Sequence, residues 1–174
     1  MDLRYPIGPM VLERTPPPDL QQAWIADIEA APAALRAAVG DLSAEQLDTR
    51  YRPGGWTVRQ LVHHVPDSHM NAYVRFKLAM TEEVPTIKPY EEARWAELPD
   101  SFDTPVETSL TLLELLHSRW VVLLRSMGEI DFDRSYFHPE LGQKVALKTA
   151  LGMYAWHGKH HVAHVTTLRQ RMEW

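Results

Sequence analysis

The sequence predicts an all-α protein built as a four-helix bundle. Four long segments carry apolar residues at the three-and-four spacing of an amphipathic helix. The chain shows no strong series of strands, no internal repeat and no low-complexity segment. Because amphipathic helices bury their apolar stripes most simply against one another, we expect one bundle domain over residues 1–174. At least one long crossover, short extra helices and a small β-hairpin complete the expected fold.

The first long helix is expected to follow a proline-rich N-terminal arm. Residues 1–18 contain five prolines, each of which fixes φ and removes a backbone donor. This arm should therefore be extended and lie on the surface of the domain or on a partner subunit. Asp19 is the expected N-cap of the helix, whose apolar pattern runs to Val39. Pro32 should bend or split it.

Two capped helices are expected next, with a break between them. Ser43 should cap a short helix in "SAEQLDTR", and Thr57 should cap the second long helix. The stretch "YRPGGW" separates them, because Pro-Gly-Gly does not continue a helix. Pro66 predicts a kink or a local distortion within the second long helix.

The remaining chain predicts a long connection and two further long helices. Residues 83–104 are rich in proline and acidic side chains, with one helical turn expected around "EEARWAE". A connection of this length often covers a site or meets another subunit. The third long helix should run from about Pro105 to Met127 and the fourth from about Thr149 to the C-terminus. Between them, "RSYFHPELGQKVAL" is typical of a small hairpin.

Composition excludes several classes of function. The formal net charge is −5 and the chain contains no cysteine. Without a basic excess to neutralise phosphates, nucleic acid is not an expected partner, and any metal must be held by nitrogen and oxygen. The N-terminus lacks an apolar run of the length that a signal peptide or membrane span requires. We expect a cytoplasmic protein that does not bind a membrane and whose partners are small molecules or other protein chains.

Four of the nine histidines fall within the eight residues "HGKHHVAH" of the last helix. His157 and His161 are four residues apart, the spacing at which two imidazoles on adjacent turns can bind one divalent ion. His160 and His164 have the same spacing but are rotated toward the flank of the helix, where they could support the ligands or lie on the surface. Spacing alone does not choose between the pairs, whereas the apolar pattern of the helix places the first pair on its inward side.

A third ligand has to come from another helix, because two ligands rarely make a catalytic site. In "QLVHHVPDSHM" of the second long helix, His64 lies beside the face set by Leu61 and Val65, and His63 is turned about 100° away. Three histidines with one water would give an open tetrahedral site. Asp67 follows one turn later and could orient an imidazole through its second nitrogen.

Other polar residues on these helices are expected to have structural or solvated roles. His117 is interpreted as a buried or boundary histidine, and His69 and His138 as structural residues. Arg75 is expected to be solvated, although it could reach an anionic ligand at the mouth of the bundle.

Three stretches, "LRYPIG", "WTVRQLVHHVPDSHMNAYVRFKLA" and "YAWHGKHHVAHV", resemble the YfiT-like group of metal-dependent hydrolases in the DinB-like superfamily. The resemblance covers nearly the whole chain. It implies a four-helix bundle that holds one divalent ion per chain, usually zinc or nickel, on three histidines. The family pattern is a histidine eight residues after a tryptophan, followed by an H-x-x-x-H pair. It implies His64, His157 and His161 as ligands, and His164 stands where many relatives have glutamine.

The resemblance and the three histidines favour a metal-dependent hydrolase that activates water for attack on a small molecule. Unlike zincin helices, this one has no glutamate in its histidine pair, so the general base would be Asp67, Glu82 or His160. An S-transferase dependent on a low-molecular-weight thiol is the alternative, because the superfamily also resembles such enzymes. A non-catalytic metal-binding bundle, with His164 or His160 closing the ligand set, is the third. Family members often pair, which implies a homodimer.

Overall fold

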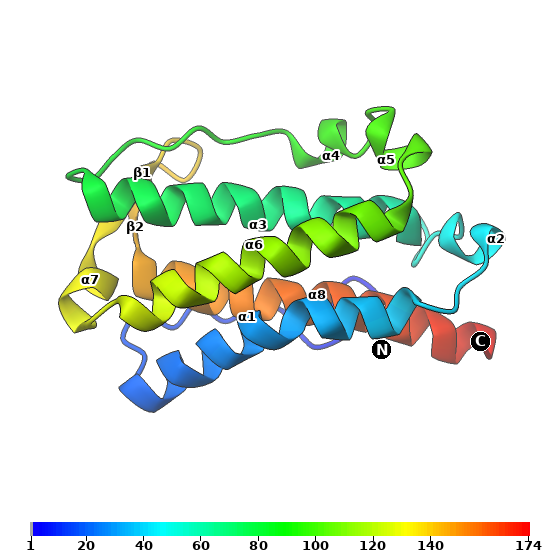
Figure 1. Ribbon diagram of the computed structural model, residues 1–174, viewed down its shortest axis with the longest axis horizontal. Helices are drawn as coiled ribbons and strands as arrows, with labels where there is room; N and C mark the ends of the chain where they lie inside the picture. Colours follow the sequence, from blue (N-terminus) through cyan, green and yellow to red (C-terminus); the bar gives the residue numbers. More distant parts are fainter. Residues whose placement is uncertain (1) are drawn as a thin grey trace.

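Four long helices lie side by side in the computed structural model, which describes residues 2–174 (Figure 1). They are α1 (Pro18–Val39), α3 (Val58–Thr81), α6 (Val106–Ser126) and α8 (Leu147–Met172). Helix α8 packs against α1 and α3, and α6 packs against the same two helices. The predicted four-helix bundle is confirmed. Within residues 2–174, no helix combines the length and the apolar character that crossing a bilayer requires.

The connections between the helices set their directions. Helices α1 and α8 run one way along the long axis of the molecule, and α3 and α6 run the other way (Figure 1). Residues 82–105 return along the length of α3, which allows α6 to start beside the beginning of α3. This long connection carries two single-turn helices, α4 (Glu92–Trp95) and α5 (Asp100–Asp103). The sequence predicts the first of these turns and not the second.

Side-chain caps begin two of the helices, as the sequence predicts. Ser43 caps α2 (Ala44–Leu47) and Thr57 caps α3, each accepting a hydrogen bond from the backbone N–H three residues further on. In both caps the glutamine at that third position accepts a hydrogen bond from the backbone N–H of the cap residue. These reciprocal bonds satisfy two donors that a helix N-terminus would otherwise leave free. Thr57 thereby fixes the start of the helix that carries His64.

The prolines of α1 act differently from the expectation. The helix begins at Pro18, after Pro17 in an extended conformation, so Asp19 lies in the first turn and is not the N-cap. Proline suits this first position because its missing N–H would have no helical partner there. Pro32 does not split α1, and α3 likewise continues through Pro66. Both residues are buried, and both helices continue although each proline removes one helical hydrogen bond.

A β-hairpin closes one end of the bundle before α8 begins. Strand β1 (Ser135–His138) pairs antiparallel with β2 (Gln143–Ala146), as predicted. Gly142 adopts a φ of +61° in the connecting turn, a conformation that favours glycine. The five-residue helix α7 (Glu129–Asp133) precedes the hairpin, and the sequence pattern does not predict it. Helix α8 begins at Leu147, two residues before the expected start.

The core consists of two apolar clusters with a layer of histidines between them. One cluster includes Phe76, Trp120 and Leu151, and the other includes Leu61, Leu113 and Leu168. On α3, α6 and α8, four histidines fall between the residues of the two clusters, and His64 lies one position before Val65 at the edge of the second cluster. We refer to these residues as the histidine layer: His64, His69, His117, His157 and His161.

Candidate metal centre

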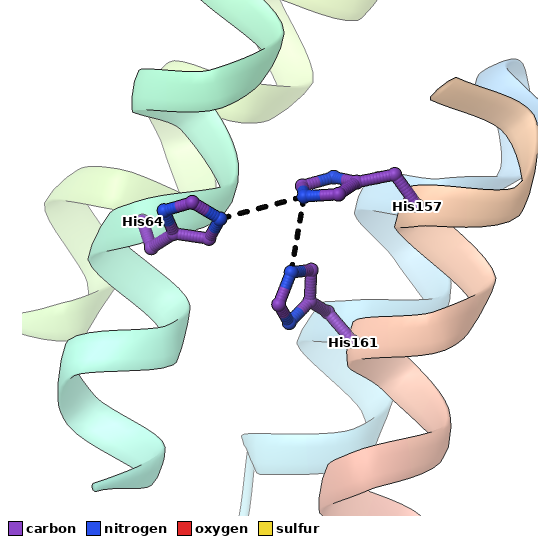
Figure 2. Close-up of side chains that lie close together, drawn as sticks. All are labelled: His64, His157 and His161. Carbon is purple, nitrogen blue, oxygen red and sulfur yellow. Dashed lines mark hydrogen bonds between the residues drawn. The ribbon is translucent and has the colours of Figure 1, made fainter. Parts of the chain in front are cut away.

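Three histidine side chains from α3 and α8 point toward one another in the middle of the bundle (Figure 2). His157 Nε2 lies 3.4 Å from His64 Nε2 and 3.1 Å from His161 Nε2. One ring nitrogen of each residue lies within 4.8 Å of the others. The structure therefore brings together the three residues that the sequence analysis selects as ligands. We refer to them as the three-histidine site.

Local packing on α3 and α8 accounts for this convergence. His157 and His161 lie on adjacent turns of α8, with ring centroids 4.4 Å apart. His64 packs against Trp56, the tryptophan just before the Thr57 cap, with 4.7 Å between the ring centroids. Trp56, eight residues before His64, thus packs against one side of the His64 ring.

Burial keeps the three imidazoles neutral at neutral pH. Desolvation lowers the pKa of His64 to about 4. It also holds the pKa values of His157 and His161 well below the usual value, with a further lowering from neighbouring histidines. A neutral imidazole has a nitrogen lone pair available for a metal, and a protonated one has none. The site therefore presents lone pairs rather than positive charge.

A chain of hydrogen bonds fixes which nitrogen of His157 carries its proton. The backbone carbonyl of Ile28 can only accept, so His117 donates to it from Nδ1 at 2.6 Å. Burial lowers the pKa of His117 to about 4, so its Nε2 is unprotonated and accepts from His69 Nδ1 at 2.8 Å. His69 Nε2 in turn accepts from His157 Nδ1 at 3.0 Å. His157 Nε2 is consequently left with a lone pair that faces the three-histidine site. We call this chain the histidine relay.

His69 has the role that the sequence analysis gives to Asp67, because it orients an imidazole through its second nitrogen. The carboxylate of Asp67 forms no hydrogen bond with an imidazole of residues 2–174, and burial, followed by the charge of Asp100, raises its pKa to about 6. The sequence indicates only structural roles for His69 and His117. No local pattern could have revealed the relay, because it joins residues 48 and 88 positions apart on three helices. As a general base, Asp67 stays a prediction.

Replacing His69 by phenylalanine should weaken metal binding by about 10- to 100-fold. The variant keeps a ring in place but removes the acceptor of the His157 Nδ1 proton, so this proton can move to Nε2 and occupy the ligand position. Competition with a metal chelator measures the affinity, and nitrogen NMR of the imidazoles reports the tautomer of His157. His69→Gln, whose side-chain oxygen can accept from Nδ1, should recover part of the affinity.

His63 provides the matched control for this prediction. It is a buried histidine on the same helix, and its Nδ1 lies 2.7 Å from Ser109 Oγ, away from the relay. His63→Phe should lower the free energy of unfolding and leave the metal affinity unchanged. If His69→Phe bound the metal as tightly as the wild type, the orienting role of the relay would be rejected.

Gly158 stands where zincin helices carry their glutamate, and packing explains the difference. A Cβ at this position would lie 3.1 Å from the Cβ of Ala31 and 3.8 Å from Cε1 of His69. A side chain here would therefore enter the contact between α8 and α1 rather than the centre of the site. The close approach of the two helices favours a very small residue at this point.

The second histidine pair of α8 lies beside the three-histidine site and is not part of it. His160 Nε2 and His164 Nε2 are 3.0 Å apart, and both residues are buried. His160 stacks on Trp156 and His164 packs on Tyr51. In the described part of the chain, the three-histidine site is the one group that brings three potential metal ligands together. The second pair is thus buried beside aromatic rings, not on the surface.

A cavity of about 750 Å³ adjoins the three-histidine site. Its wall includes all three of these histidines and His160, but neither Asp67 nor Glu82. The N-terminal arm completes the wall through Met10, Leu12 and Arg14, and residues 2–17 form neither helix nor strand. The arm therefore covers a cavity of its own chain.

The fold and the site together define a helical bundle that can hold a metal ion on histidines from facing helices. Residues 27–165 match the DinB superfamily. The chain belongs to this superfamily, as its sequence resemblance indicates.

Relatives in Bacillus agree with this assignment. A protein of Bacillus cereus (strain 03BB102), named "Putative metal-dependent hydrolase", is 56% identical over 173 residues and covers 99% of both chains. A protein of Bacillus thuringiensis subsp. konkukian (strain 97-27) with the same description has the same identity and coverage. The solved structure of YfiT from Bacillus subtilis is described as "a probable metal-dependent hydrolase with an unusual four-helix bundle topology". It matches with a TM-score of 0.97 and 48% identity, over 100% of this chain and 99% of that chain.

Proposed function

We propose that the protein is a metal-dependent hydrolase in which His64, His157 and His161 hold one divalent ion per chain. The observation that carries the proposal is the convergence of three neutral imidazoles beside a large cavity. Their nitrogen separations of 3.1 and 3.4 Å are close to the roughly 3.3 Å between ligands of a tetrahedral zinc site. Zinc or nickel is the proposed metal, because both suit imidazole ligands.

The residues of the chain orient the ligands and handle protons. A bound divalent ion supplies Lewis acidity, which lowers the pKa of water or of a thiol and polarises the bond under attack. The histidine relay keeps the proton of His157 on Nδ1. His160 is the better-placed candidate for accepting a proton, because it lines the cavity and Asp67 and Glu82 do not. Its Nδ1 has no hydrogen-bond partner among residues 2–174.

Turnover by the metal-loaded protein tests the proposal. The zinc- or nickel-loaded wild type should hydrolyse at least one member of a broad ester and amide panel. The same protein stripped of metal should be slower by at least about 100-fold. Reloading with the metal should restore the rate, which controls for damage during chelation. If the loaded protein hydrolysed nothing in the panel, the hydrolase proposal would be abandoned.

An S-transferase dependent on a low-molecular-weight thiol is the second candidate, and the composition of the cavity favours it. Among residues 2–174, Glu92 is the sole acidic residue in the cavity wall, and its side chain is exposed. The wall therefore offers no buried carboxylate as a base for water attack. A thiol with a pKa near 8.5 needs less help to ionise than water does. Addition of bacillithiol or mycothiol should change the spectrum of the cobalt-substituted protein, and an unchanged spectrum would remove this candidate.

A non-catalytic metal site is the third candidate and has the weakest support. It requires a closed set of four protein ligands. No fourth donor joins the three-histidine site within the described residues, which favours the two enzymatic candidates.

A further inference from the structure

One arginine in the cavity wall is buried without a negatively charged partner. Arg75 on α3 is 7% exposed, so the expectation that it is solvated is wrong. None of the ion pairs among residues 2–174 includes it, whereas five other arginines pair with carboxylates: Arg4, Arg36, Arg59, Arg125 and Arg169. A buried guanidinium without a counter-charge is costly, which indicates that a partner comes from outside the chain.

The polar groups around Arg75 are also only partly used. Arg75 Nη1 donates one long hydrogen bond of 3.4 Å to the hydroxyl of Tyr154. Arg75 Nε, the hydroxyl of Tyr136 and His138 Nδ1 are buried with no partner among residues 2–174. All four residues line the cavity. Because buried polar groups are normally hydrogen-bonded, this cluster indicates a ligand with acceptor oxygens.

The position of Arg75 relative to the three-histidine site limits the shape of that ligand. Arg75 follows His64 by eleven residues, so both residues lie on one face of α3. Their Cα atoms are about 16 Å apart along the helix axis. Tyr154 lies between the two groups, with its ring 6.0 Å from that of His157 and its hydroxyl beside Arg75. A molecule that contacts both groups within this one cavity has to be elongated.

Charge in the rest of the cavity wall agrees with an anionic ligand. Arg14 and Lys144 are exposed in the wall, opposed by the single carboxylate of Glu92. With Arg75, the wall carries an excess of positive charge that attracts anions toward the cavity.

We propose that Arg75, with the hydroxyls of Tyr136 and Tyr154, forms a binding subsite for a carboxylate of the substrate. The substrate is then an elongated molecule whose reacting group lies at the three-histidine site and whose carboxylate lies at Arg75. One buried positive charge matches one negative charge, and the planar guanidinium matches the two oxygens of a carboxylate. The location of the reacting group rests on the proposed function, whereas carboxylate binding at Arg75 requires no metal.

Binding of hexanoate to the metal-free protein tests the subsite. Trp56 and Trp156 line the cavity, so tryptophan fluorescence can follow binding. The wild type should bind hexanoate at millimolar concentration, and Arg75→Gln should weaken this binding by at least about tenfold. Uncharged hexanamide should bind the two proteins equally. Arg59→Gln is the matched control, because Arg59 lies on the same helix, pairs with Asp48 and is not in the cavity wall.

Thermal melting separates the subsite from a role in folding. Without ligand, Arg75→Met should melt at or above the temperature of the wild type, because it removes an unpaired buried charge. Hexanoate should raise the melting temperature of the wild type and Arg59→Gln but not of Arg75→Met. A lower melting temperature for ligand-free Arg75→Met would mean that the charge already has a partner in the protein, and would overturn the inference.

The remaining outcomes are equally decisive. If the wild type bound no hexanoate, or if Arg75→Gln bound it equally well, the subsite would be overturned. Tighter binding of hexyl phosphate than of hexanoate would overturn the assignment to a carboxylate. Because the assay uses metal-free protein, a failed hydrolysis screen would leave a positive binding result at Arg75 intact. A failed binding result at Arg75 would likewise leave the proposed hydrolase activity untouched.

Discussion

Replacing any one of His64, His157 and His161 by alanine should abolish stoichiometric metal binding. The wild type should hold about one equivalent of zinc or nickel, because three neutral nitrogens converge on one point. Loss of a ligand should lower the affinity by more than about 100-fold, since mutation of a residue that only hydrogen-bonds a ligand already costs about 10- to 100-fold. Elemental analysis of untagged, dialysed protein measures the bound ion.

His164→Ala is the control for these three variants. His164 is also buried on α8, and its Nε2 lies 3.0 Å from that of His160, much as His161 lies near His157. It belongs to no group of three donors among residues 2–174, so its variant should keep the ion. If the wild type carried no ion and took up neither zinc nor nickel, the metal site would be rejected. If His164→Ala lost the ion as well, the choice of ligands would be wrong.

Acid should destabilise the metal-free protein strongly between pH 7 and pH 5. Burial lowers the folded-state pKa of His64 and of His117 to about 4, from 6.5 in the unfolded chain. Between these values the unfolded chain binds more protons, so stability falls as the pH falls. Each of the two histidines should cost about 2 kcal/mol at pH 5. The other buried members of the histidine layer have lowered pKa values and act in the same direction.

Asp67 opposes this trend without reversing it. Its folded-state pKa is raised to about 6, so its protonation favours the folded protein by about 1 kcal/mol on going from pH 7 to pH 5. The net loss from these three residues is roughly 3 kcal/mol, a large part of the stability of an ordinary domain. Urea unfolding at the two pH values measures the difference.

His117→Gln serves as the control for the acid effect, because it removes one titrating group from the core. The pH dependence of its unfolding free energy should shrink by about 2 kcal/mol. A free energy of unfolding that stayed constant from pH 7 to pH 5 in the wild type would show that the buried histidines do not resist protonation.

Local patterns predicted most of the fold. Apolar spacing indicated the four long helices, and Ser43 and Thr57 marked the helix starts that they cap. The errors lie where packing overrides local preference. Pro32 is buried and does not split α1. Helix α7 is too short for its periodicity to be recognised.

The sequence predicted the histidines of the site better than their surroundings. The ligand candidates are visible because two share one helix face and the third follows Trp56 at the family spacing. Arg75 and His69 could not be interpreted in the same way, because their burial and their partners depend on how α3, α6 and α8 meet. Hydrophobic pattern indicates which face is buried, but not which polar side chains meet across helices.

The histidine layer also affects how cooperatively the protein unfolds. Apolar contacts are concentrated in two clusters, one on each side of the layer, and the middle of the core is held by hydrogen bonds between imidazoles. A ligand that binds only the folded chain adds its binding free energy to folding. An ion bound where the two clusters meet would therefore couple them, so that both ends of the bundle unfold in one cooperative transition.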